Sequence, residues 1–183
     1  MIRSIIFLLL FLAHFFSSAG QEAKSSTKLS SLIKLDLGGQ GLGLTYEPRL
    51  SDKILLVISG GVGGGYDIAE GFMEINYAYP AMYFSLTPKY YYNRQRRIEK
   101  GKGTFLNAGN YIGIRVKYVG ANEMYRNSMM ANLHWGMQRA LGQRWTFNFH
   151  VGAGYAQDID YNFGTIYPAV DFAFSYVFYN SKK

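Results

Sequence analysis

Two histidines are the residues of this chain best suited to acid–base chemistry. His134 and His150 are the only histidines after residue 14, and each lies in a segment in which apolar and polar residues alternate. Neighbouring strands would bring the two imidazoles within reach of each other, where they could form a proton-linked or ligand-binding polar core. A lipid-modifying hydrolase would add a serine nucleophile, but no spacing joins Ser59 or Ser128 to either histidine.

Metal and cofactor chemistry have no comparable signal. The chain has no cysteine, which removes thiolate ligands and disulfides. Two histidines alone leave a zinc ion short of the ligands that it needs. The sequence therefore predicts no catalytic residue, no metal site and no cofactor, and it favours a protein that is not an enzyme.

A charged set shares its strand face with the two histidines. This face lacks large aliphatic side chains, and an unpaired charge in an enclosed interior would cost several kcal/mol. We therefore expect a network of salt bridges and hydrogen bonds that fills the interior of the fold. Its predicted members are Lys34, Asp36, Glu47, Lys89, Arg115, Lys117, His134, His150 and Asp171.

The most basic stretch lies between residues 93 and 107. Either a solvated loop or a contact with lipid phosphates or an acidic partner fits its composition. Its charged residues are a single acid, Glu99, and the bases Arg94, Arg96, Arg97, Lys100 and Lys102.

Acidic residues gather in two other stretches, 67–74 and 158–160. The second contains Asp158-x-Asp160-x-Asn162-x-Gly164, which has part of an oxygen-rich calcium loop but not the full pattern. We expect an ordinary polar turn there.

Strands must position these residues. Apolar and polar side chains alternate with a period of two from residue 31 onward, and no helical period competes. Clusters of Gly, Asn and Asp separate the segments. The alternation predicts an all-β fold of eight strands, over residues 33–37, 42–47, 56–66, 82–93, 111–118, 129–138, 145–155 and 170–178.

The two faces distinguish a soluble sandwich from a membrane barrel. A sandwich turns its large apolar residues to a core, whereas a membrane barrel turns them to lipid and carries aromatic girdles at its rims. Because charge lies on the face without large aliphatics, we expect an eight-stranded antiparallel up-and-down transmembrane β-barrel. The expected girdle consists of Tyr46, Tyr66, Tyr90, Tyr92, Tyr118, Trp145, Tyr155, Tyr176 and Phe178.

Strand parity orients this barrel. An even number of strands returns the C-terminus to the periplasmic side on which the N-terminal tail begins. The short turns at 48–53 and 141–144 and the basic stretch then lie in the periplasm, and the loops at 67–79, 120–127 and 158–164 lie outside. A barrel of this size is just wide enough for its own side chains, so we expect no water-filled pore.

The N-terminus has the pattern of an export signal. Arg3 precedes an apolar run from Ile5 to Phe16 and small residues at 17–20, which predicts a cleaved signal peptide over residues 1–20. The apolar run is shorter than the ~20 residues that cross a bilayer as a helix. A polar periplasmic tail over 21–30, a β-barrel domain over 31–179 and a C-terminal tail over 180–183 complete the predicted organisation.

The net charge and the predicted export together limit the classes of partner that we expect. The formal net charge is +7, but an exported protein rarely meets nucleic acid. The expected partners are outer-membrane lipids and lipopolysaccharide, the barrel-assembly machinery during biogenesis, and an unidentified protein.

The signal peptide, the turn at 48–53, the Tyr-Tyr-Tyr-Asn run at 90–93 and the Gly-Asn-Tyr at 109–111 together resemble small uncharacterised outer-membrane β-barrel proteins of Gram-negative bacteria. The resemblance covers nearly all of the mature chain and implies a bacterial outer-membrane location and a barrel fold only. The last four residues, Asn-Ser-Lys-Lys, depart from the aromatic ending common in such proteins, and Phe178 is the nearest substitute.

These observations leave three functional hypotheses. The favoured one is a barrel with a side-chain-filled lumen and a structural or surface-interaction role. A narrow channel or small-ligand carrier is the alternative, suggested by small residues on the inner face at Gly61, Gly63, Gly65, Gly152 and Gly154. A lipid-modifying enzyme that uses His134 or His150 is the third.

Overall fold

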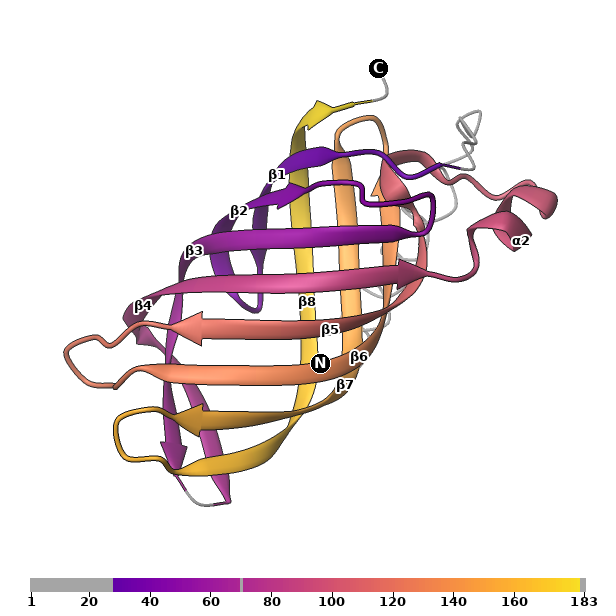
Figure 1. Ribbon diagram of the computed structural model, residues 1–183. Helices are drawn as coiled ribbons and strands as arrows, with labels where there is room; N and C mark the ends of the chain where they lie inside the picture. Colours follow the sequence, from indigo (N-terminus) through magenta and orange to yellow (C-terminus); the bar gives the residue numbers. More distant parts are fainter. Residues whose placement is uncertain (1–27, 70, 182–183) are drawn as a thin grey trace, which may run out of the picture.

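The computed structural model describes residues 28–69 and 71–181 (Figure 1). Its strands are β1 (Leu32–Gly38), β2 (Gly41–Glu47), β3 (Ile54–Ala69), β4 (Phe72–Tyr91), β5 (Gly109–Val119), β6 (Ser128–Leu141), β7 (Trp145–Asp158) and β8 (Gly164–Asn180). A short helix, α2 (Arg94–Glu99), and a 3₁₀ turn, η1 (Phe105–Asn107), lie between β4 and β5.

The eight strands form a closed antiparallel ring. Each strand pairs with its neighbours in sequence, and β1 closes the ring by pairing with β8. The predicted all-β class, the number of strands and their antiparallel order are confirmed. We call the end of the ring at which β1 begins and β8 ends the terminal end, and the opposite end, where the β5–β6 and β7–β8 loops lie, the loop end (Figure 1).

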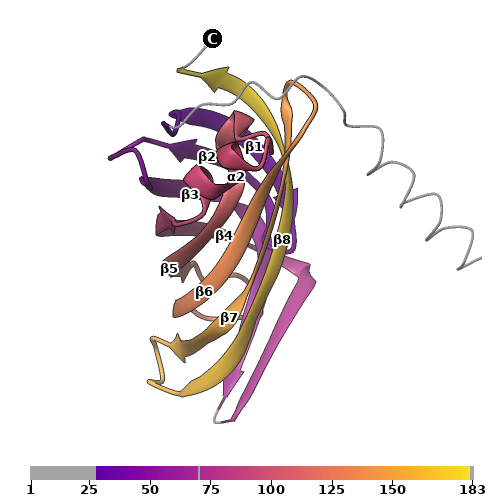
Figure 2. The ribbon, with the colours of Figure 1, turned by 90° about the vertical axis from the view of Figure 1, so that its right-hand side faces the viewer.

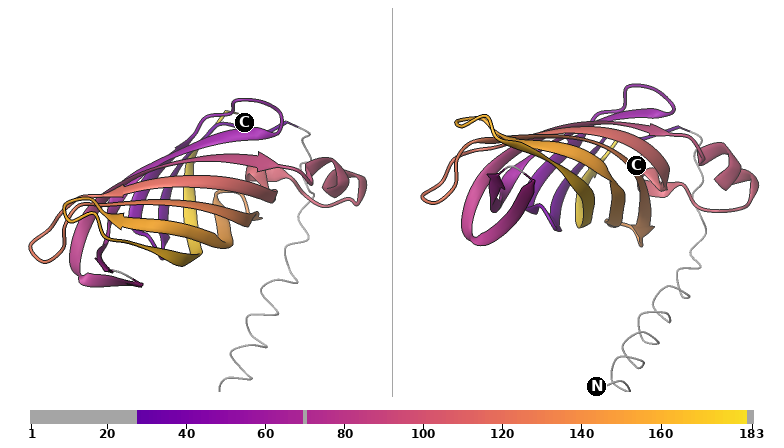
Figure 3. Two further views of the ribbon diagram at one scale, coloured as in Figure 1. Left: turned by 60° about the horizontal axis from the view of Figure 1, so that its bottom comes forward. Right: turned by 90° about the horizontal axis from the view of Figure 1, so that it is seen from below.

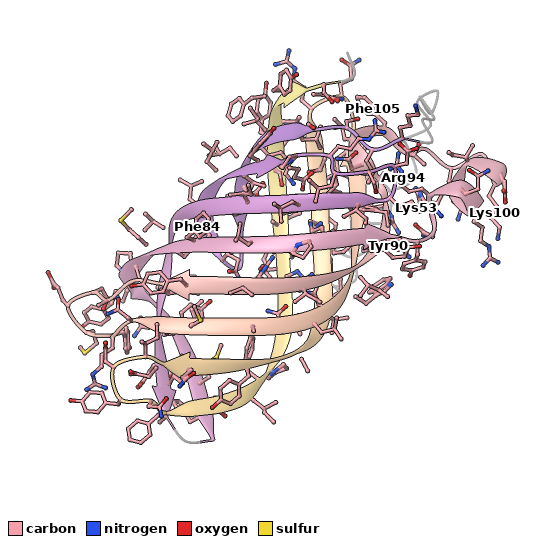
Figure 4. All side chains as sticks on the ribbon, viewed as in Figure 1. Lys53, Phe84, Tyr90, Arg94, Lys100 and Phe105 are labelled. Atoms are coloured by element: carbon pink, nitrogen blue, oxygen red, sulfur yellow. The ribbon has the colours of Figure 1, made fainter. Side chains whose placement is uncertain are left out.

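Side chains sort onto two faces with the period of the strands. From Ala81 to Tyr91 every second residue of β4 is buried and the residues between are exposed. The exposed side chains are largely apolar: Phe84 lies on the outer side of β4 (Figure 4), and Leu133 and Phe172 are exposed on β6 and β8. Many of the large apolar residues therefore face outward, and the buried ones form three separate clusters instead of one central core.

The predicted end of β3 and start of β4 differ from the structure because the β3–β4 hairpin is longer than expected, and β8 begins at Gly164 instead of residue 170. Residues 67–79, predicted as a loop, are mostly strand, and the chain reverses at Gly71, whose φ is +75°. The pairing shifts register between Gly64 and Gly65, where β4 has extra residues before Pro80. Glycines and a proline inside a strand mark a bulge as well as an end, which is why the sequence prediction stopped the strands too early.

The prediction that no segment is helical is wrong for residues 94–99. Helix α2 has only six residues, too few for a helical period to show in the sequence. Neither described helix is long and apolar enough to cross a membrane.

Strands β1 and β2 are shorter than the other strands of the ring, so the sheet is low at this point. Strand β3 pairs with β2 only as far as Val62, and β8 pairs with β1 only from Ala173 onward. The β8 segment from Gly164 to Phe172 therefore has ladder pairing on its β7 side alone, and we call its other side the free edge.

Pro168 lies on this free edge. The Phe172 carbonyl accepts from the Gly39 N–H, so Phe172 points its backbone groups toward β1. Backbone groups alternate between the two edges of an antiparallel strand, so the backbone of Pro168 faces the same way. Because proline has no N–H, this edge presents one donor fewer to another strand.

The predicted signal peptide over residues 1–20 and residues 21–27 of the predicted tail over 21–30 lie outside the described residues, as do residues 182–183. Strand β8 ends at Asn180, one residue beyond the predicted domain boundary.

Pro168→Val is expected to increase self-association through the free edge. The new N–H restores a donor on an exposed strand, and a net hydrogen bond of about 1 kcal/mol would strengthen pairing roughly fivefold. Cross-linking and sedimentation of the purified protein would measure it.

Pro88→Val is the matched control. The backbone nitrogen of Pro88 faces the neighbouring strand β5. The Met82 carbonyl accepts from the Gly120 N–H on the β5 side, and Pro88, six residues further along β4, faces the same side. Equal self-association of the two variants would show that Pro168 does not protect the edge.

Candidate functional site

The interior of the ring, which we call the lumen, receives all the side chains predicted to fill it. Lys34, Glu47, Lys89, Lys117, His134, His150 and Asp171 are buried, and Asp36 and Arg115 are partly buried. Every strand of the ring except β3 contributes at least one of these residues, and their contacts differ from one end of the lumen to the other.

Near the terminal end, Lys34 and Glu47 form a buried ion pair. The two strands of the β1–β2 hairpin place them side by side, with Lys34 Nζ 2.8 Å from Glu47 Oε1. Their side chains are 3% and 0% exposed, so neither can be compensated by water if the other is lost. The Asn107 side-chain amide donates to the second carboxylate oxygen at 3.5 Å.

The turn η1 closes the terminal end. Leu106 and Asn107 have φ values of 48° and 59°, and Leu106 packs against Leu32 and Val177 at the mouth of the ring. Asparagine tolerates this conformation better than most residues. Its side chain also exchanges two hydrogen bonds of 2.8 Å with the backbone of Ser30, which ties the turn to the start of β1.

Arg94 supports this closure from α2. Its guanidinium donates to the carbonyls of Thr104 and Ala108, both at 3.3 Å, and to that of Lys28 at 3.0 Å. Burial lowers the pKa of the Arg94 guanidinium, yet such a group stays charged in proteins and keeps all its donors. Arg94 is therefore a structural member of the basic stretch.

The other bases of this stretch differ from Arg94. Arg96, Lys100 and Lys102 are exposed, and Arg97 donates to the Gly103 carbonyl at 2.9 Å. Figure 4 shows Lys100 and Lys53 projecting at the end of the molecule where α2 lies. Figure 2 shows α2 over the terminal end of the ring.

In the middle of the lumen, two carboxylates take different partners. Asp171 Oδ2 lies 3.1 Å from Arg115 Nη1. Asp36 Oδ2 accepts from Thr45 Oγ1 at 2.6 Å, and that hydroxyl lies 2.6 Å from Ser59 Oγ. The remaining oxygens, Asp36 Oδ1 and Asp171 Oδ1, have no protein partner and so remain available to water or a small ligand.

The two histidines meet, as the order of their strands requires. Their ring centroids lie 4.2 Å apart, and His134 Nδ1 is 2.7 Å from Asn132 Oδ1. His134 Nε2 has no protein partner. In the part of the chain that the structure describes, no three His, Asp or Glu side chains are arranged to hold a metal ion.

Neither serine considered as a nucleophile stands beside the histidines. Ser59 is hydrogen-bonded to Thr45, and Ser128 begins β6, six residues before His134. Six residues of strand span about 20 Å, well beyond the reach of a hydrogen bond. The geometry gives the enzyme hypothesis no nucleophile–base pair at these positions.

Two lysines are held by tyrosines. Lys117 Nζ donates to the Tyr66 hydroxyl at 2.9 Å and lies 4.6 Å from the Tyr66 ring centre and 4.9 Å from that of Tyr83. Lys89 Nζ lies 4.4 Å from the ring centre of Tyr111. The predicted network of salt bridges and hydrogen bonds therefore also includes cation–π contacts at these two lysines.

The inward tyrosines are the members of the lumen that the sequence prediction missed. Tyr83, Tyr91 and Tyr111 are buried at positions in step with Lys89 on the polar face. That shared alternation is the available signal, but the sequence prediction assigned aromatic residues to the rims. Tyr66 was predicted to lie in the outer girdle, but its side chain is buried in the lumen and bound to Lys117.

The loop end of the lumen is closed by the β3–β4 hairpin. Tyr66 and Ile68 pack with Val119, Met130 and Ala156, which belong to β5, β6 and β7. The bulge at Gly64 lets the hairpin leave the direction of the main sheet, a turn that Figures 1 and 3 show clearly. Apolar contacts therefore seal this end, and η1 seals the other.

The remaining predicted girdle residues lie on the outside. Tyr46, Tyr90, Tyr92, Tyr118, Trp145, Tyr155 and Phe178 are exposed, and Tyr176 is partly exposed. Several of them contact other aromatic side chains: the Trp135 indole N–H donates to the Tyr92 hydroxyl at 2.7 Å, and the Trp145 and Tyr176 ring centroids lie 5.2 Å apart.

The acidic stretch at 158–160 forms a turn. Asp158 Oδ1 accepts from the backbone N–H groups of Asp160 and Tyr161, at 2.9 and 3.0 Å. Its other oxygen lies 3.5 Å from Arg126. These contacts are those of an ordinary polar turn, as expected from the sequence.

Comparisons with known proteins give no further guidance, since no family model, no curated protein and no solved structure matches the chain.

Lys34→Met is expected to lower the free energy of unfolding by about 3–5 kcal/mol, because it leaves the Glu47 carboxylate buried and unpaired. Lys34→Met with Glu47→Leu should recover most of that loss, since no charge then remains. Urea titration of the folded protein would measure both.

Arg49→Gln provides the comparison for an exposed ion pair. Arg49 pairs with Asp52 at the surface, so its loss should cost less than about 1 kcal/mol. A loss for Lys34→Met no larger than for Arg49→Gln would contradict the role given to the buried pair.

Proposed function

We propose that the protein is an outer-membrane β-barrel of a Gram-negative bacterium, with a filled lumen and a structural or surface-interaction role. The observation that carries the proposal is the inversion of the ring, with apolar side chains outside and paired charges inside. The predicted signal peptide supports the location.

A water-soluble ring would need to expose this apolar surface to solvent. Outward residues such as Leu44, Ile114, Leu133 and Val170 are each more than half exposed and recur around the ring. Soluble proteins rarely expose contiguous apolar patches of more than a few hundred Å². Lipid is therefore the medium that suits this face, and the exposed aromatic residues near both ends suit its two interfaces.

The two closures favour a structural or interaction role over transport. Leu106 fills the lumen at the terminal end, and Tyr66 and Ile68 fill it at the loop end. Outer-membrane lipids and lipopolysaccharide would surround such a barrel, and the barrel-assembly machinery would insert it.

A small-ligand carrier is the second candidate. Asp36 Oδ1, Asp171 Oδ1 and His134 Nε2 lack protein partners in the enclosed lumen, where unpaired polar groups are costly. A small polar molecule retained in native mass spectra of the purified protein would favour it, and a preparation without one would favour the structural role.

Leu133→Arg tests the lipid-facing surface. Leu133 lies in the middle of β6 and is 58% exposed. If this face meets hydrocarbon, the arginine should cost about 2–4 kcal/mol of stability in vesicles and slow insertion. If the face meets water, an exposed substitution should change stability by less than about 0.5 kcal/mol.

Met124→Arg is the matched control. Met124 is exposed to a similar extent, 56%, but lies in the loop between β5 and β6. It should leave stability unchanged. Equal, small effects of both arginines would refute membrane insertion.

The closed lumen predicts no stable ion conductance. Planar-bilayer recordings of the inserted protein should show no discrete channel steps, because apolar residues fill both ends of the lumen. Heat-modifiable migration on a gel would establish that the recorded protein was folded. Steady conductance would argue against the structural role and for the channel hypothesis.

A further inference from the structure

Charge divides unequally between the two ends of the ring. The terminal end carries two described acids outside the lumen, Asp52 and Glu99, against the bases Lys28, Arg49, Lys53, Arg94, Arg96, Arg97, Lys100, Lys102, Arg139 and Arg144. The loop end carries one base outside the lumen, Arg126, against the acids Asp67, Glu74, Glu123, Asp158 and Asp160. Outside the lumen, bases therefore greatly outnumber acids at the terminal end, whereas acids outnumber bases at the loop end.

Several of these bases lie at the level of exposed aromatic side chains. The Arg144 guanidinium donates to the Tyr176 hydroxyl at 2.9 Å, and Tyr176 packs against Trp145. The Lys53 carbonyl accepts from the N–H of Tyr91, and Figure 4 shows Lys53 close to the adjacent residue of β4, the exposed Tyr90. Aromatic side chains of this kind mark the interface of a bilayer, which is also where lipid phosphates lie.

The charges of Lys53 and Arg144 are available to a ligand. Both residues are exposed, and neither forms an ion pair with an acid among the described residues. Exposed Arg96, Lys100 and Lys102 extend the positive surface onto α2 and the segment after it. We call Lys53, Arg144 and these three residues the basic rim.

We propose that the basic rim binds the phosphate groups of anionic phospholipids in the leaflet at the terminal end. This inference rests on the proposed membrane barrel and names the lipid class at one of its interfaces. The acidic loop end would repel the same headgroups, so the charge distribution also favours one orientation of the chain. Lipid is preferred over a soluble acidic partner because the aromatic residues beside Lys53 and Arg144 place them at an interface.

The two tryptophans of the chain give a direct readout. Trp135 and Trp145 are the only tryptophans, and both contact tyrosines of the terminal end. Bromine on a lipid chain quenches indole fluorescence by contact. The protein would be folded into phosphatidylcholine vesicles that contain brominated phosphatidylglycerol or, in parallel, the same fraction of brominated phosphatidylcholine.

Brominated phosphatidylglycerol is expected to bind more tightly than brominated phosphatidylcholine at low salt, by about fivefold for each base of the rim that the bound lipid contacts. The preference should fall as salt is raised, because the charges are screened. Equal quenching by the two brominated lipids at low salt would overturn the proposal.

Variants test whether the basic rim, and not another part of the protein, causes the preference for phosphatidylglycerol. Lys53→Gln with Arg144→Gln should remove most of the preference, whereas Arg126→Gln at the loop end should leave it unchanged. A preference that survives the double variant would place the lipid contact elsewhere and contradict the proposal.

Failure of the membrane barrel itself would look different. No quenching by either brominated lipid would mean that the tryptophans do not reach a bilayer, which contradicts the proposed function. Strong quenching by both without preference contradicts the lipid class alone. Retention of the preference in the variant Lys53→Arg with Arg144→Lys would show that charge is the recognised property.

Discussion

Closure of the sheet on itself is the constraint on which the rest of the structure depends. Once β1 pairs with β8, every strand has one face inside a narrow space and one outside it. A charge on the inner face must then find a partner within reach, which explains the Lys34–Glu47 and Arg115–Asp171 pairs. The outer face, freed of charge, is left with the aliphatic and aromatic residues.

Much of this arrangement is predictable because a strand has a period of two. The alternation in β4 to β8 sets which side chains face inward, and the whole predicted charged set lies in the lumen. The closures are not predictable in the same way. They depend on contacts between distant segments, such as Asn107 with Ser30 and Tyr66 with Lys117, which no local period records.

The same limit explains the misplacement of Tyr66. Its parity is correct for the outer face of β3, but the register shift at Gly64 and Gly65 lies between it and the rest of the strand. Beyond that bulge the hairpin turns across the ring, and a residue assigned to the outside packs into the lumen. A run of glycines thus signals that alternation cannot be extrapolated.

The low wall at β1 and β2 has a consequence for the proposed barrel. Each of these strands has 7 residues, whereas a strand that crosses a bilayer needs about 9–11. The bilayer would therefore be thin beside the β1–β2 hairpin, or water would reach the free edge of β8, because backbone groups cannot remain unpaired in hydrocarbon. Pro168 removes one such group from this edge, and the Tyr77 hydroxyl donates to the Gly39 carbonyl at 2.5 Å at the tip of the hairpin. Both features reduce the number of unsatisfied groups at the place where the ring is least complete.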